Sequence, residues 1–299
     1  MSHPSPAALR PAPDQPLPAP GWTRSPLLRA IAFFAILLLG LQAANDFVTA
    51  ESTPLWLSTL VPVVLSVAGY LLVCTILEGR GRPHELAPRR IGGLAAGFAL
   101  GGGVCLVVFG LCWVMGWQQV LGIRPDAPLL GPVLALGLAV GIIEEIIFRG
   151  VLFRTVELGL GTWGAVLASA VVFGMAHLAN PDATMTGAVA IALEAGVALG
   201  LLYAWSRSLW LVIGVHAGWN ALLHPVLGSA LSGALPAGDG LVVSRPSGPE
   251  LLSGGAFGLE ASLVSVLVWL AVSAWVALRL RRDGTVVAPW WVRRRAETY

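Results

Sequence analysis

LLGPVLALGLAVGIIEEIIFRGVLF, residues 129–153, is an apolar stretch that contains Glu144, Glu145 and Arg149. About 20 consecutive apolar residues cross the hydrocarbon core of a bilayer, so the stretch predicts a transmembrane helix. An ionised side chain at the centre of such a helix costs about 2.5–3.5 kcal/mol on insertion scales. Three ionisable groups in one span therefore indicate either an internal ion pair or a functional site.

The composition of the whole chain is that of a membrane protein. Of its 299 residues, 56% are hydrophobic and 11% are charged, and the mean hydropathy is +0.79. These values are far from those of soluble globular proteins. The net charge of +2 is too small to indicate a nucleic-acid partner. The three cysteines, Cys74, Cys105 and Cys112, lie within apolar runs, so we interpret them as core residues rather than disulfides or metal ligands.

Eight apolar stretches are long enough to span a membrane. They are residues 27–44, 54–77, 91–116, 129–153, 162–179, 186–205, 208–228 and 259–280. Because backbone exposed to lipid must satisfy its hydrogen bonds internally, we predict an all-α polytopic bundle of about eight transmembrane helices. We expect residues 1–25 to be a disordered, proline-rich cytoplasmic arm, residues 26–283 the membrane domain, and residues 284–299 a basic cytoplasmic tail.

The arginines predict the orientation of the bundle. With both termini in the cytoplasm, the loops at 78–90, 154–161 and 206–207 are cytoplasmic, and only Arg124 and Arg245 fall in external loops. This asymmetry follows the positive-inside rule. All basic residues are arginine, and glycine and alanine are abundant, which is typical of a GC-rich bacterial genome. We therefore expect an integral protein of the bacterial inner membrane.

The polar residues of three predicted helices form a pattern. Glu145 and Arg149 are an i,i+4 pair, which leaves Glu144, about 100° away, without a partner. In VVFGMAHLANP (171–181), Phe173 and His177 share one helix face. In LVIGVHAGWNALLHP (211–225), three polar residues, His216, Asn220 and His224, recur every fourth position. We predict that these helices converge on one buried site that contains water, rather than form separate interhelical hydrogen bonds.

These motifs resemble the CAAX prenyl protease type 2 family of intramembrane proteases, also called CPBP or Abi proteins. The family's motifs are E-E-x-x-x-R, F-x-x-x-H and H-x-x-x-N on successive helices. Here they are Glu144, Glu145 and Arg149; Phe173 and His177; then His216 and Asn220. The resemblance covers a protease-like core of about residues 130–228. It implies an endopeptidase that acts on membrane-associated or lipidated proteins or peptides in the bilayer.

The resemblance also implies roles for the residues. Glu144 is the expected base for the attacking water, because desolvation raises a carboxyl pKa towards neutrality. His177 orients the same water, His216 and Asn220 stabilise the oxyanion, and Arg149 holds Glu145. Which glutamate is the base stays open at this point.

Metal dependence is a second open question. Glu144, His177 and His216 together have the chemistry of a His₂Glu zinc site. No H-E-x-x-H helix is present. We favour a mechanism without metal or other cofactor.

Two further residues are candidates for the surroundings of the site, together with Phe173. Glu194 lies in AIALEAGVALG, where the family leads us to expect a small or apolar residue. It either is protonated or hydrogen-bonded to a neighbouring helix, or tunes Glu144 or Arg149. His224 precedes Pro225 and is expected to mark a helix end.

Glu144 and His177 are predicted to lie at different depths in the membrane. Glu144 is expected slightly to the cytoplasmic side of the membrane centre, whereas His177 is expected near the outer end of its helix. Helix tilt, a later start to the fifth helix, or a re-entrant stretch around 154–162 would bring them together.

Two other function classes fit the sequence less well. A catalytically idle scaffold or bacteriocin-immunity protein would not need three intact motifs, and a proton-coupled carrier is disfavoured by the lack of inverted repeats. Prenylated proteins are not expected in bacteria. We therefore expect the substrates to be peptides that undergo maturation, or bacteriocins.

Overall fold

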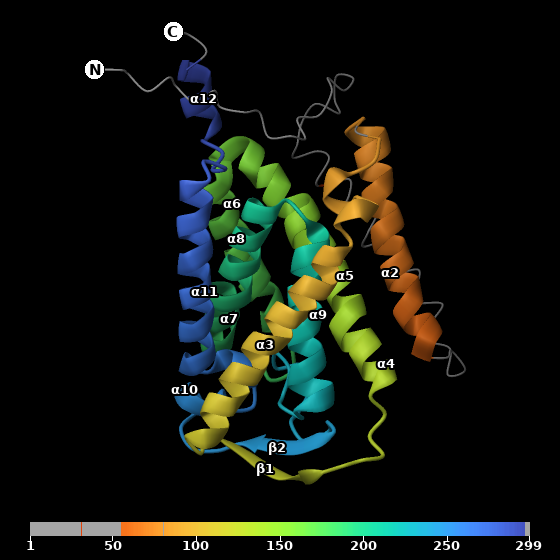
Figure 1. Ribbon diagram of the computed structural model, residues 1–299, viewed down its shortest axis with the longest axis vertical. Helices are drawn as coiled ribbons and strands as arrows, with labels where there is room; N and C mark the ends of the chain where they lie inside the picture. Colours follow the sequence, from red (N-terminus) through yellow and green to blue (C-terminus); the bar gives the residue numbers. More distant parts are fainter. Residues whose placement is uncertain (1–30, 32–54, 80, 297–299) are drawn as a thin grey trace.

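The computed structural model of the chain describes residue 31, residues 55–79 and residues 81–296. This part is a bundle of helices closed at one end by a small two-stranded sheet (Figure 1). Six of its helical segments are long and apolar enough to cross a membrane, which confirms the all-α polytopic prediction. The predicted arm at 1–25 and nearly all of the predicted first helix at 27–44 lie outside the described residues.

The elements follow one another along the chain with these bounds. They are α2 (Leu55–Leu72), η2 (Val73–Leu77), η3 (His84–Leu86), η4 (Pro88–Arg90), α3 (Gly92–Val114), β1 (Gln118–Ile123), α4 (Leu130–Pro132), η5 (Val133–Ala139), α5 (Val140–Glu145), η6 (Ile146–Phe153), α6 (Arg154–Ala176), η7 (His177–Ala179), α7 (Met185–Ile191), η8 (Ala192–Gly196), α8 (Val197–Ser206), α9 (Leu209–Ala221), η9 (Leu222–Val226), β2 (Val242–Pro246), α10 (Glu250–Ser253), η10 (Leu259–Ala261), α11 (Leu263–Arg282) and α12 (Trp290–Ala296).

The helical segment Leu130–Ala179 runs through the bundle twice, because it folds back at Gly161 (Figure 1). Gly161 has φ 71° and ψ −178°, a conformation that is essentially restricted to glycine. The prediction of a loop over 154–161 is wrong, since the chain stays helical up to this turn. Glu157 explains why: it is buried, and it accepts hydrogen bonds from Thr162 (2.7 Å) and from Arg207 (2.8 Å).

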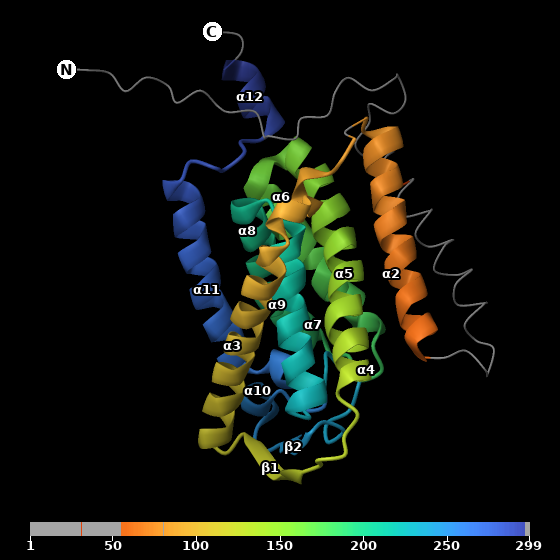
Figure 2. The same cartoon turned by 45° about the vertical axis from the view of Figure 1, so that its right-hand side comes forward.

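The central helix α9 packs closely against α3, which crosses it in Figure 2. A Cβ atom on Gly97 of α3 would lie 2.1 Å from the carbonyl oxygen of Leu211, and one on Gly214 of α9 would lie 2.2 Å from that of Leu94. Only glycine permits this approach, as is common where transmembrane helices cross. The other face of α9 is left to pack against η5 and α5.

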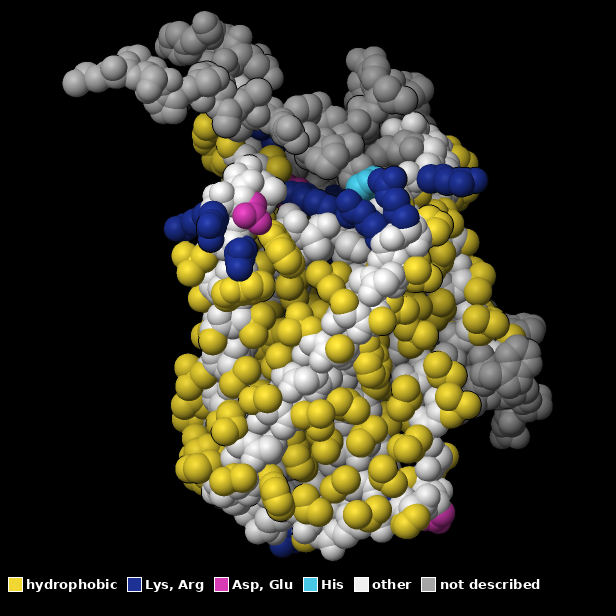
Figure 3. Space-filling view, viewed as in Figure 1, with side chains coloured by type: hydrophobic (Ala, Val, Ile, Leu, Met, Phe, Trp, Pro, Cys, Tyr) yellow, Lys and Arg dark blue, Asp and Glu magenta, His cyan; other side chains and the backbone are white. Residues whose placement is uncertain are grey.

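The surface separates into an apolar middle and two polar ends. Figure 3 shows hydrophobic side chains over the middle of one face and arginines gathered near the end that carries α12. Arg124 follows β1 and Arg245 lies in β2, at the opposite end. Among the described residues, the arginines of the predicted cytoplasmic loops and tail and those of the predicted external loops thus lie at opposite ends, and which end faces the cytoplasm stays a prediction.

The antiparallel sheet of β1 and β2 was not predicted. Its two strands belong to the connections after α3 and η9, outside the six apolar spans. Local β-propensity and water on one side are sufficient for a short antiparallel pair in such a position. The sheet ties the two connections together beneath the bundle (Figure 2).

Candidate active site

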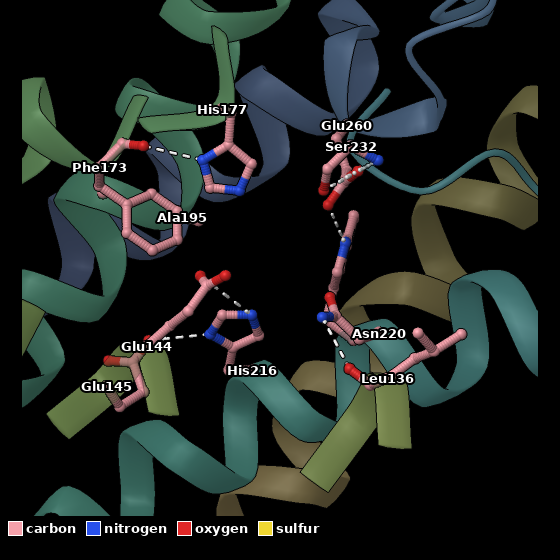
Figure 4. Close-up of polar contacts among 12 residues, drawn as sticks. Leu136, Glu144, Glu145, Phe173, His177, Ala195, His216, Asn220, Ser232 and Glu260 are labelled. Atoms are coloured by element: carbon pink, nitrogen blue, oxygen red, sulfur yellow. Dashed lines mark hydrogen bonds and ion pairs between the residues drawn. The ribbon is translucent and has the colours of Figure 1, made fainter. Parts of the chain in front are cut away.

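A cavity of about 360 Å³ lies between the helices that carry the three motifs. Glu144 of α5, His177 of η7, and His216 and Asn220 of α9 all line it (Figure 4). The structure therefore brings together four residues that are far apart in the sequence, as the motifs led us to expect. Their chemical roles stay predictions.

The disagreement in depth is resolved by the turn at Gly161. At about 1.5 Å per helical residue, Glu144 lies about 25 Å before the turn and His177 about 24 Å after it. The two residues therefore face each other on adjacent limbs of one helical hairpin. The depths of Glu144 and His177 predicted from the sequence differed because a loop was expected over 154–161, where the structure has helix.

Each histidine is oriented through its Nδ1 atom. Nδ1 of His216 lies 2.9 Å from Oε1 of Glu145, and Nδ1 of His177 lies 2.8 Å from the carbonyl oxygen of Phe173. Both partners are acceptors when Glu145 is ionised, so each Nδ1 donates its hydrogen. Nε2 of each ring is then left for the cavity, and that of His216 lies 3.9 Å from Oε2 of Glu144.

Arg149 holds Glu145 behind the wall of the cavity, as predicted. Its Nη1 donates to Oε1 of Glu145 (2.8 Å), and both side chains are fully buried. Nη2 donates to the carbonyl oxygens of Ala195 (3.0 Å) and Gly196 (3.2 Å), at the end of the π-helical turn η8. The guanidinium also lies over the ring of Phe173, 4.8 Å from its centroid. These contacts offset part of the cost of burying the arginine charge, while Nε of Arg149 and Oε2 of Glu145 are buried without a partner among the described residues.

Phe173 packs the second motif against the first and the third. Its ring centroid lies 4.8 Å from those of Phe148 and His177, and 6.2 Å from that of His216. The side chain is buried, and it lines the cavity between the two histidines. Its position agrees with the predicted supporting role.

Asn220 is partly engaged by the backbone. Its Nδ2 donates to the carbonyl oxygen of Leu136 in η5 at 3.1 Å. An amide nitrogen carries two hydrogens, so one remains for another acceptor. Asn220 thus both ties α9 to the helix that carries Glu144 and keeps a donor for the cavity.

Glu194 and His224 occupy different surroundings. Glu194 lines the cavity and accepts a hydrogen bond from Ser265 of α11, and no bond to Glu144 or Arg149 is present among the described residues. His224 lies outside the cavity lining, and its Nδ1 donates to the carbonyl oxygen of Ser229 (2.9 Å). That bond closes the turn after α9, in agreement with a helix-end role.

The residues considered for zinc do not form a ligand cluster in this arrangement. Within residues 55–79 and 81–296, no three His, Cys, Asp or Glu side chains gather closely enough to hold a metal ion. Glu144, His177 and His216 share the cavity, but they do not converge on one point with the short distances that zinc requires.

Glu260 is a cavity residue that the sequence did not single out. It is buried, and it accepts hydrogen bonds from Nε1 of Trp219 (3.2 Å) and from the backbone nitrogen and hydroxyl of Ser232 (2.6 and 2.8 Å). Burial raises the pKa of Glu260. Ser232 has φ 51°, in the left-handed region that non-glycine residues rarely adopt.

A signal for Glu260 was present in the sequence. It is the acidic residue within the predicted last helix at 259–280. That helix begins only at Leu263, so Glu260 lies in the short turn η10 in front of it and faces the cavity.

Comparison with known proteins agrees with this geometry. Residues 126–222 match a family model described as type II CAAX prenyl endopeptidase, Rce1-like. This segment carries all three motifs, so the resemblance to the CAAX protease family is confirmed. Neither the curated proteins nor the solved structures contain a match to the chain.

Proposed function

We propose that this member of the CAAX prenyl protease family is an intramembrane endopeptidase in which Glu144 activates the attacking water. The family consists of endopeptidases that act on membrane-associated proteins. The matched segment contains the helical hairpin and α9, which together supply the Glu144, His177, His216 and Asn220 side chains.

The observation that carries the proposal is the difference between the two adjacent glutamates. The side chain of Glu145 is fully buried and bonded to Arg149 and His216. That of Glu144 is 27% exposed and lines the cavity. A base must reach the water whose proton it takes, so Glu144 is the base and Glu145 a positioning residue.

The chemistry follows from this arrangement. Glu144 takes a proton from water as the water oxygen bonds to the substrate carbonyl carbon. Protonated His216 and the free amide hydrogen of Asn220 stabilise the resulting oxyanion. As the C–N bond breaks, the leaving amine takes a proton from protonated Glu144. His177 orients the attacking water in the first step and the leaving amine in this one. The products are a carboxylic acid and an amine.

The proposed reaction uses no metal. Every group that it needs is supplied by side chains that line the cavity. The polar site lies within apolar spans, so it suits a peptide that enters from the bilayer rather than a soluble protein. We propose membrane-associated peptides of a bacterial inner membrane as the substrate class, with both chain termini of the enzyme in the cytoplasm.

The test compares full-length wild-type protein with Glu144→Gln in liposomes, with Glu250→Gln as the control. Glu250 is an exposed carboxylate outside the cavity. Quenched-fluorescence apolar peptides report cleavage, and mass spectrometry compares membrane peptides that accumulate in cells carrying each variant. We expect cleavage by wild type and Glu250→Gln only. Full activity of Glu144→Gln, or pH-driven uptake without cleavage, would refute the proposal.

A further inference from the structure

Part of the cavity lining is acidic and aromatic. Glu194 and Glu260 form this part, with exposed fractions of 2% and 4%, together with Trp219 and Trp269. The two tryptophan rings lie edge to face, with centroids 5.6 Å apart. None of the four is a defining residue of the three motifs, although Trp219 lies between His216 and Asn220 of the third motif.

Neither carboxylate forms an ion pair with an arginine among the described residues, and the nearest basic side chain in the cavity lining is that of His177, which lowers the pKa of Glu260. No arginine lines the cavity in the part of the chain that the structure describes, and the sequence contains no lysine. Arg149, on the neighbouring helix, is already bound to Glu145 and to backbone carbonyls. Buried carboxylates are ordinarily paired with a cation or a full set of donors.

The hydrogen bonds leave acceptor capacity that points to a ligand. Glu194 receives one bond, from Ser265 to its Oε2, and its Oε1 has no hydrogen-bond donor among the described residues. Oε1 of Glu260 receives one bond, from Trp219, although a carboxylate oxygen can accept two. Both carboxylates of this lining therefore keep an oxygen that can accept a further hydrogen bond.

We propose that Glu194 and Glu260, with Trp219 and Trp269, form a subsite that binds a cationic group of the substrate next to the scissile bond. An alkylammonium or guanidinium group would donate to the open carboxylate oxygens and neutralise both charges. The faces of tryptophan rings attract the same cations. The inference deepens the proposed endopeptidase function, on which it rests, by giving its substrate a positive charge.

Ser232 shapes this subsite. Its left-handed backbone directs both its N–H and its hydroxyl to Oε2 of Glu260, while Asn180 donates to its carbonyl oxygen at 2.6 Å. The carboxylate of Glu260 is thereby fixed with two bonds at Oε2 and one, from Trp219, at Oε1, which can accept one more. A strained backbone conformation that the surrounding hydrogen bonds hold in place is typical of functional sites.

The experiment measures binding and cleavage separately, in full-length protein reconstituted in liposomes. The probes are two fluorescent apolar peptides that differ only in lysine or norleucine beside the central bond, each with a free or an acetylated amino terminus. Binding is measured with Glu144→Gln, which keeps the subsite. We expect the lysine peptide to bind at least about tenfold more tightly than the norleucine peptide, because one charge-assisted hydrogen bond contributes about that much affinity.

Adding Glu194→Gln and Glu260→Gln should remove this preference, so that the lysine and norleucine peptides bind alike, whereas adding Glu250→Gln should retain it. If affinity depends on the free amino terminus of the peptide rather than on its lysine, the cationic group that binds the subsite is the amino terminus of the substrate. Equal binding of all peptides, or a lysine preference that survives both substitutions, would overturn the inference. Selective binding without cleavage by wild type would instead leave the subsite standing and refute the endopeptidase.

Discussion

Nε2 of His216 lies 3.9 Å from Oε2 of Glu144, too far for a direct hydrogen bond. On its other side, the imidazole of His216 is held by Glu145, which is in turn held by Arg149. Oε2 of Glu144 is buried without a hydrogen-bond partner among the described residues, whereas Oε1 of Glu145 is bonded to both Arg149 and His216, so the two adjacent glutamates have different surroundings.

Replacing the proposed base should remove catalysis without unfolding the protein. We expect Glu144→Gln to lower kcat/KM by about 10²–10⁴-fold, the usual contribution of a positioned base. The side chain is partly exposed and has no short hydrogen bond, so thermal stability should change little. Peptide cleavage and thermal unfolding are measured on the same preparation. A strongly destabilised variant would show that Glu144 is structural.

Replacing Arg149 should act mainly on stability. Removing one partner of a buried ion pair costs about 3–5 kcal/mol, because the other charge stays buried without compensation. We expect Arg149→Met to lose this amount and Glu145→Gln/Arg149→Met to lose less than the sum of the two single changes. A double-mutant cycle of unfolding free energies measures the coupling. Strictly additive effects would contradict the pairing of Glu145 with Arg149.

The turn at Gly161 should tolerate no side chain. A Cβ atom there would lie 2.5 Å from the carbonyl oxygen of Val287, and the backbone is in a region essentially restricted to glycine. We expect Gly161→Ala to cost about 1–3 kcal/mol of stability and to lower activity. Gly159→Ala is the matched control, since no atom lies within 4 Å of its added Cβ. Equal effects of both changes would argue against a specific turn.

Binding of the cationic peptide should depend on pH through Glu260. Burial raises the pKa of this carboxyl, while hydrogen bonds from Ser232 and the nearby His177 lower it. Glu194 and Cys105 also lie within electrostatic range. Protonation removes the negative charge, so KM for the lysine peptide should rise as pH falls through the mildly acidic range. The Glu260→Gln variant should lack this part of the rise, and identical profiles would contradict the assignment.

Metal dependence is tested directly. We expect purified protein to contain well below one zinc ion per chain and to cleave peptides at the same rate after chelation. Elemental analysis and activity before and after dialysis against a chelator measure this. Stoichiometric zinc with activity that falls on chelation and returns with zinc would refute the glutamate mechanism.

Hydropathy and motif spacing predicted most of what positions the site. The spans carrying Glu144, His177 and His216 were predicted because apolar length and intramembrane charge are direct physical signals. The helical course of 154–160 was missed, since Glu157 is buried there by contact with Arg207, in the connection between α8 and α9, which is distant in sequence. Glu260 was missed because its place depends on where α11 begins.

The π-helical turns also could not be predicted. The carbonyls of Ala195 and Gly196 become acceptors for Arg149 through tertiary packing, which hydrophobic periodicity does not contain. The same holds for the left-handed backbone of Ser232, which is fixed by partners distant in sequence. Contacts between distant segments thus account for the parts of the site that local patterns do not specify.

Because the helix folds back at Gly161, the lengths of its two limbs determine whether Glu144 and His177 face each other. One residue inserted into either limb would shift the residues beyond it by about 1.5 Å and rotate them by about 100°. Glu144 and His177 would then no longer face the same cavity. An equal insertion in both limbs would restore the depth but not the rotation, so the number of residues between the first two motifs is as much a constraint on the enzyme as the motifs themselves.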